Sequence, residues 1–105
     1  MIMTPAANVA GRTVVEDLGL VRGNTIRARH VGRDILAALK SIVGGEIQDY
    51  TKMMAEAREQ SLDRMHEEAR ELGADAVVNV RFGTSYLMGG AAEILVYGSA
   101  VRLGS

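Results

Sequence analysis

The feature that most constrains the fold is a helical pattern over residues 46–72 that passes directly into a strand pattern. Apolar or small side chains recur there every three or four positions, as on one face of an α-helix: Ile47, Tyr50, Met54, Ala57, Ser61, Met65, Ala69 and Leu72. Gly73 can adopt the left-handed conformation that ends many helices, and Arg70 suits the negative helix end. From residue 76 to 82 the period changes to two, which is typical of a strand. The sequence therefore predicts a long helix, a tight stop and a strand.

The part of the chain before this helix has weaker signals. Residues 13–27 are rich in β-branched residues and predict a strand region, in which Gly19 and Gly23 are expected bulges or turns. The pattern fits one bent strand or a hairpin equally well. Residues 33–43 predict a helix of about three turns, and the glycine pair at 44–45 closes it.

The end of the chain completes the expected fold. Residues 88–90 (Met-Gly-Gly) predict a turn, and residues 94–103 a last strand that contains Gly98. The order is then a strand region, two helices and two strands. That order predicts an α+β fold, with a mostly antiparallel sheet on which one short and one long helix pack. At 105 residues the chain is expected to form a single domain over 1–105.

Composition excludes several classes of function. Twelve basic against thirteen acidic side chains give a net charge of −1, so no bulk field attracts nucleic acid or anionic lipid. Cysteine is absent, which removes disulfides, thiolate nucleophiles and cysteine-based metal sites. No secretory leader or membrane-spanning run is recognisable. We therefore expect a cytoplasmic protein that binds neither nucleic acid nor membranes.

Two features suggest that the chain associates with itself. A helix over 46–72 would be about 40 Å long at 1.5 Å per residue, more than a domain of this size covers with its own sheet. Both faces of the last strand also carry apolar side chains, although antiparallel sheets usually leave one face wet. We expect a homo-oligomer, and the alternative is a monomer in which the short helix covers the second face.

Several segments resemble the YbjQ family, a bacterial family labelled as heavy-metal-binding. The resemblance covers nearly the whole chain and is carried by Ile42-Val43-Gly44-Gly45, Tyr50, Ala57-Arg58, Ala69-Arg70, Leu72-Gly73-Ala74-Asp75-Ala76-Val77-Val78 and Gly98-Ser99-Ala100-Val101. The last segment has serine where the family usually has threonine, a change that affects only fine packing. The resemblance implies a dodecin-like α+β subunit in a homopentamer, with no established enzymatic activity.

The chain offers few ligands for the metal that this label names. Soft metals select thiolate and thioether ligands, and Met54 and Met65 fall in the apolar stripe, where they are expected to fill the core. His30 and His66, with Asp63 and Glu67 near the latter, are the remaining candidates for a divalent metal. Zinc sites need three or four convergent protein ligands, so a solvated surface histidine is the competing interpretation.

A basic cluster is the first candidate anion site. Arg27, Arg29, His30 and Arg33 gather where the strand region gives way to the predicted short helix. Arginine forks and free helix N–H groups bind phosphate or carboxylate. The competing interpretation is a solvated rim or an interface, with nearby carboxylates as partners.

Arg58 is a second candidate, because it falls beside the apolar stripe of the long helix. A buried guanidinium must be paired or hydrogen-bonded. The sequence allows a structural ion pair with Asp75 or a neighbouring subunit's carboxylate, bonds to strand-end carbonyls, or a bound anionic ligand.

We expect a non-catalytic oligomeric protein that holds a small ligand or a metal in inter-subunit clefts. The first alternative is an enzyme with His30 or His66 as general base and Arg58 or Arg33 as anion clamp. The second is a purely structural assembly protein. No nucleophile, base and orienting group occur at a recognisable spacing, which favours the non-catalytic interpretation.

Overall fold

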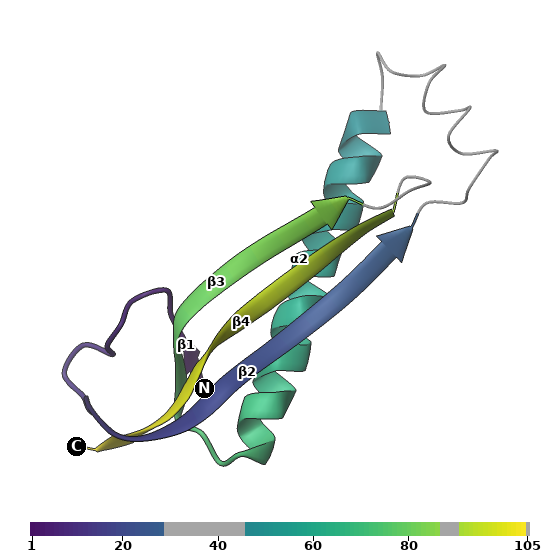
Figure 1. Ribbon diagram of the computed structural model, residues 1–105. Coiled ribbons are helices and arrows are strands. Elements are labelled where there is room, and N and C mark those ends of the chain that lie inside the picture. The colour runs from purple at the N-terminus through teal and green to yellow at the C-terminus, as the bar shows by residue number, and fades with distance from the viewer. Residues whose placement is uncertain (29–45, 87–90, 105) are drawn as a thin grey trace.

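The computed structural model describes residues 1–28, 46–86 and 91–104 (Figure 1). One helix, α2 (Glu46–Glu71), lies on a four-stranded sheet of order β1-β3-β4-β2. The strands are β1 (Ile2–Met3), β2 (Thr13–Ala28), β3 (Ala76–Tyr86) and β4 (Ala91–Gly104). β1 is parallel to β3, and the other two strand pairs are antiparallel.

The α+β class is therefore confirmed, but the sheet is mixed. The prediction missed β1, because two residues are too few to show a period. The structure describes one helix, and the predicted helix over 33–43, the glycines at 44–45 and the turn at 88–90 lie outside the described residues. The last strand is longer at both ends than the predicted 94–103.

The end of α2 follows the prediction closely. Gly73 has a φ of 76°, and its N–H donates to the carbonyl of Arg70 over 2.9 Å. The N–H of Ala74 reaches back to the carbonyl of Ala69 over 3.1 Å. These two bonds form a Schellman motif, which satisfies carbonyls that the helix end would otherwise leave unpaired.

β2 is a single bent strand, so the alternative of a hairpin over residues 13–27 does not hold. Its register against β4 shifts twice, between Val14 and Glu16 and between Asp17 and Gly19. Gly19 has a φ of 105° at the second shift, as expected for a bulge glycine. The same expectation for Gly23 was wrong, because Gly23 pairs in regular register with Val96. Its role lies in the contact with α2, described below.

β3 contains a bulge that the simple alternation did not predict. Val78 pairs with Ser99 and Arg81 with Tyr97, so two residues of β3 lie opposite Gly98. Asn79 takes up the extra residue with a φ of 54°, a conformation that asparagine tolerates better than most residues. The bulge restores Val80 to the same side of the sheet as Val77.

Two apolar clusters result, on opposite faces of the sheet. The larger one faces α2 and contains Val21, Met65, Ala69, Val77, Val80, Val96 and Ala100. The smaller one contains Ala76, Val78 and Val101, and Val9 of the N-terminal segment packs against it. The N-terminal segment lies beside the ends of the strands near both termini (Figure 1) and is bound to β3 through Thr4 and Ala6. Part of the second face is therefore covered by the chain itself.

Candidate functional site

The contact between α2 and the sheet is built around a buried polar pair. Ser61 is fully buried and its Oγ lies 2.9 Å from Thr25 Oγ1 and 3.1 Å from the carbonyl oxygen of Ile94. A hydroxyl has one proton, and the carbonyl can only accept, so Ser61 donates to Ile94 and Thr25 donates to Ser61. All three groups are satisfied without water. Ser61 thus belongs to the buried stripe, as predicted, and its hydroxyl also anchors the helix to two strands.

Gly23 allows the helix to approach this closely. A Cβ atom at position 23 would lie 2.1 Å from the backbone oxygen of Ser61 and 2.6 Å from the backbone nitrogen of Met65. Real Cβ atoms never come so near to backbone atoms, and only glycine fits. The sequence signal that could have indicated this contact is a serine in an apolar helix stripe, combined with a glycine inside a strand.

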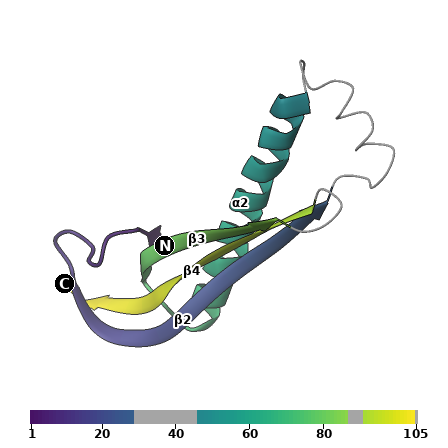
Figure 2. The same cartoon turned by 45° about the horizontal axis from the view of Figure 1, so that its top comes forward.

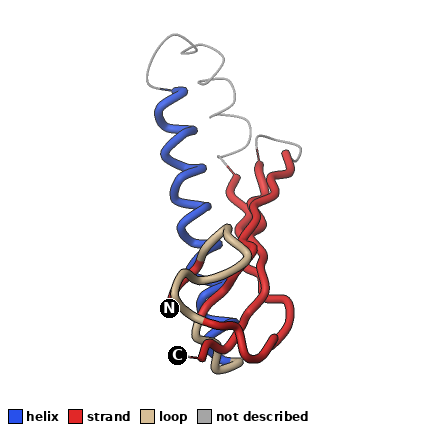
Figure 3. Tube along the Cα trace, turned by 90° about the vertical axis from the view of Figure 1, so that its left-hand side faces the viewer, coloured by secondary structure: helices blue, strands red, loops and turns tan. Residues whose placement is uncertain are grey.

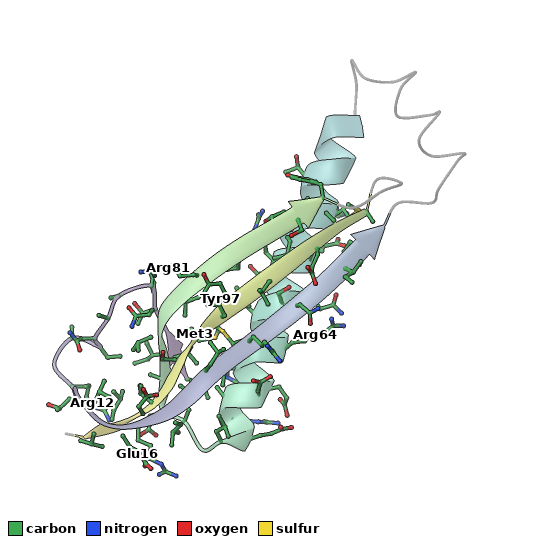
Figure 4. All side chains as sticks on the ribbon, in the orientation of Figure 1. Met3, Arg12, Glu16, Arg64, Arg81 and Tyr97 are labelled. Atoms are coloured by element: carbon green, nitrogen blue, oxygen red, sulfur yellow. The ribbon has the colours of Figure 1, made fainter. Side chains whose placement is uncertain are left out.

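Arginine side chains tie one flank of α2 to β2. Arg27 donates to Gln60 Oε1 over 2.8 Å, and Arg64 donates to the backbone carbonyl of Asn24. Figure 4 shows Arg64 on the side of α2 that lies beside β2. Arg27 is thus bound within the subunit, whereas positions 29, 30 and 33 of the predicted basic cluster lie outside the described residues.

Arg58 is exposed in the single subunit, so the guanidinium is not buried within one chain as expected. It lies on the flank of the buried stripe opposite to Gln60 and Arg64, about 60° from Ser61 on a helix with 3.6 residues per turn. Its guanidinium makes no hydrogen bond or ion pair with another described residue. α2 ends at Glu71, about 20 Å further along the helix axis. Asp75 follows the turn after that end and accepts a bond from the N–H of Leu103 over 2.9 Å. Arg27 and Arg58 therefore do not converge on one anion.

We expect Arg58→Ala to change the free energy of unfolding of the single subunit by no more than about 0.5 kcal/mol, as is usual for exposed positions. Urea denaturation of wild type, Arg58→Ala and Arg58→Lys at low protein concentration measures this. A loss of about 3–5 kcal/mol would instead require a buried carboxylate partner. If the loss grew with protein concentration, that partner would belong to a second copy.

The metal candidates on α2 lie about one turn apart on one side of the helix. Asp63 and Glu67 are exposed, and Glu67 is already paired with Arg70 over 2.7 Å. His66 is half-buried. No group of three or more His, Asp or Glu side chains gathers within the described ranges, and Met65 is enclosed in the core. The donor set of one subunit therefore does not fit a soft heavy metal, since the chain has no thiolate and its described imidazole stands without converging ligands.

The enzyme alternative also lacks convergent groups in this part of the chain. His66 and Arg58 are eight residues apart on α2, or about 12 Å along the axis, and Arg58 is exposed to solvent. His30 and Arg33 lie outside the described residues. α2 is not apolar enough to cross a membrane.

Comparison with known proteins places the chain in a family. A family model described as "Putative heavy-metal-binding" matches residues 1–104. The chain belongs to the YbjQ family. A UPF0145 protein of Archaeoglobus fulgidus is 62% identical to it, over 98% of this chain and 95% of the relative. Another UPF0145 protein, from Methanosarcina acetivorans, is 53% identical over 98% of this chain and 97% of the relative.

A solved structure shares the fold. It is a protein of unknown function of the DUF74 family from Pediococcus pentosaceus, with a TM-score of 0.63 and 13% sequence identity. The match covers 99% of this chain and 98% of that chain. At this identity the likeness supports the fold alone. The resemblance of this chain to the YbjQ family is confirmed by the family model and by the relatives.

Because the donor set of one YbjQ subunit does not fit a soft metal, we expect weak binding of zinc and copper. Calorimetric titration of metal-free protein should show no stoichiometric binding with a submicromolar Kd. His66→Ala serves as the matched variant and should give the same heats as wild type. Tight wild-type binding that disappears in His66→Ala would contradict the expectation and would place a real site on α2.

Proposed function

We propose that this protein is a non-catalytic homo-oligomer, and that a small ligand or a metal binds where its subunits meet. The observation that carries the proposal is the shape of the single chain. Its radius of gyration is 17.4 Å, and it extends over 56 × 21 × 16 Å. A compact domain of this length has a radius of gyration of about 13 Å.

The exposed surface leads to the same proposal. Large apolar side chains form part of this surface, including Leu20, Ile26, Phe82 and Tyr86. Self-association would remove them from water.

The resemblance to the YbjQ family supports a pentamer as the specific assembly. The metal-ligating side chains of the single chain support binding between subunits. One copy offers His66, Asp63 and Glu67 without convergence, so a metal site would need donors from more than one copy. An enzyme is the weaker candidate, because the described histidine and the exposed Arg58 do not form a base with an anion clamp.

Native mass spectrometry of protein purified without added metal tests this function. It reports the number of subunits and any retained ligand in one measurement. We expect one closed oligomer, with five subunits as the specific expectation. Sedimentation at micromolar concentration provides an independent check. A monomer in both experiments would overturn the proposal, including the idea of a site between subunits.

A further inference from the structure

Beyond its bulge, β3 carries side chains on the face of the sheet that α2 occupies, but the helix does not cover them. Phe82 pairs with Val96 and Tyr86 with Ala92, and these two partners on β4 are buried. Phe82 itself is 48% exposed and Tyr86 is 73% exposed. The reason is that α2 packs on β2 and β4, as its contacts with Thr25 and Ile94 show. We call Phe82 and Tyr86 the β3 flank.

The helix contributes to the same open side. Gln60 and Arg64 bind β2, so the residues on the other side of the buried stripe face β3. Those residues include Arg58 and Leu62, about 60° and 100° from Ser61 on the helical wheel. Leu62 is only partly buried against the core. Figures 2 and 3 show α2 diverging from the strands toward the end of the sheet away from the termini.

A second exposed apolar surface lies on the opposite face of the sheet. Leu20 is 64% exposed, Ile26 is 58% exposed, and Tyr97 of β4 is 39% exposed. Their registry partners across β2 and β4 place them on one face, which also carries Arg22 directly opposite Tyr97. Figure 4 shows Tyr97 in the middle of the sheet. We call Leu20, Ile26 and Tyr97 the outer patch.

These two surfaces point in opposite directions, which decides how copies can meet. A two-fold dimer uses the same surface on both partners, so it would cover the β3 flank or the outer patch but leave the other exposed. A head-to-tail contact covers both by repeating one interface, and it forms a ring when the rotation between successive copies closes. We propose that the outer patch of one copy packs on the β3 flank and the adjoining side of α2 in the next copy. This inference rests on the proposed homo-oligomer and names its interface.

Charge favours the same contact. Residues 46–71 of α2 contain eight acidic and four basic side chains, while the whole chain contains thirteen and twelve. The described residues outside α2 contain four acidic and five basic side chains, so the helix layer is negative and the rest of the described chain is close to neutral. On the outer patch, Arg22 is exposed and makes no hydrogen bond or ion pair with another described residue. Packing the outer patch on the helix layer of a neighbour brings the guanidinium of Arg22 toward this negative charge, which helps to orient the contact.

Two variants that each remove one surface test this arrangement. Tyr86→Glu places a charge in the β3 flank, and Ile26→Glu places one in the outer patch. Both side chains are mostly exposed in the subunit, so each variant is expected to fold, with circular dichroism as the check. Each variant alone should sediment as a monomer. An equimolar mixture should form a one-to-one heterodimer, because one variant retains the flank and the other retains the patch.

The other outcomes each overturn the inference. If one variant alone still forms a dimer, the interface is two-fold. If both variants assemble like wild type, or if the mixture stays monomeric, these surfaces do not meet, although the homo-oligomer would stand. A monomeric wild type would end the proposed function as well. Val15→Glu is the matched control: this residue is 63% exposed on β2 and belongs to neither surface, so assembly should be unchanged. If a glutamate variant fails to fold, Tyr86→Ser and Ile26→Ser replace it.

Discussion

Gly23→Ala is expected to lower the free energy of unfolding by about 3 kcal/mol, the upper end of the usual cost of overpacking a core. The new Cβ would lie 2.1 Å from the backbone oxygen of Ser61 and 2.6 Å from the backbone nitrogen of Met65. Backbone atoms in the middle of a helix cannot rotate away as a flexible side chain can. The helix must therefore shift as a unit, and Ser61 would move away from Thr25 and the carbonyl of Ile94.

Gly83→Ala is the matched control in another strand of the same sheet. A Cβ at position 83 would meet no heavy atom within 4 Å, and the backbone there is not left-handed. Alanine should be neutral, or stabilising by about 0.4–1 kcal/mol through the lower entropy of the unfolded chain. Urea denaturation of both variants beside wild type measures the difference. Similar midpoints for the two would mean that the close approach of α2 to β2 does not contribute to stability.

The elements predicted best from the sequence are those whose signals are local. The buried positions of α2 from Ala57 to Ala69 repeat at helical spacing, and Gly73 ends the helix through bonds to Arg70 and its neighbours. β4 alternates without interruption, because the extra residues of both bulged strand pairs lie on its partners. In these cases the residues that give the pattern are also the residues that form the structure.

The features that sequence could not predict depend on pairing between distant segments. β1 has two residues and forms only because β3 offers its edge. The bulge at Asn79 lets the N–H groups of Asn79 and Val80 bind the carbonyls of Ala6 and Thr4, more than seventy residues earlier in the chain. No local period can indicate such a bond. As a result, the N-terminal segment covers one end of a face that sequence alone assigned to another subunit or to the short helix.

Arg58 shows why a helical wheel is not sufficient to place a side chain. Its angular position close to the stripe suggested burial, and that position is correct. A helical wheel carries no information on where the helix lies across the sheet. α2 is tied to β2 by Arg27 and Arg64, so the flank toward β3 stays open and Arg58 faces solvent. Exposed and buried flanks of a stripe can be distinguished only when the lateral position of the helix is known.

Met65→Ala is expected to be the most destabilising truncation in the helix, at about 2–5 kcal/mol. Met65 is fully buried and is the largest fully enclosed side chain among the described residues, in a cluster with Val21, Val77 and Val96. Its removal leaves a cavity between α2 and three strands. The strands hold one another through their hydrogen bonds and cannot collapse far into that space. The loss of unfolding free energy should therefore lie well above the free energy of transferring the removed atoms out of water.

Two variants separate the cavity from other effects of the substitution. Met65→Leu retains most of the volume and should cost less than about 1.5 kcal/mol. Met53→Ala removes the same side chain from a half-buried position on the same helix and should cost less than Met65→Ala. Helix propensity changes equally in the two methionine-to-alanine variants, so the difference between their unfolding free energies reports packing. Equal losses would show that position 65 is not at the centre of the core. A loss in Met65→Leu as large as in Met65→Ala would indicate that the thioether, rather than its volume, is required.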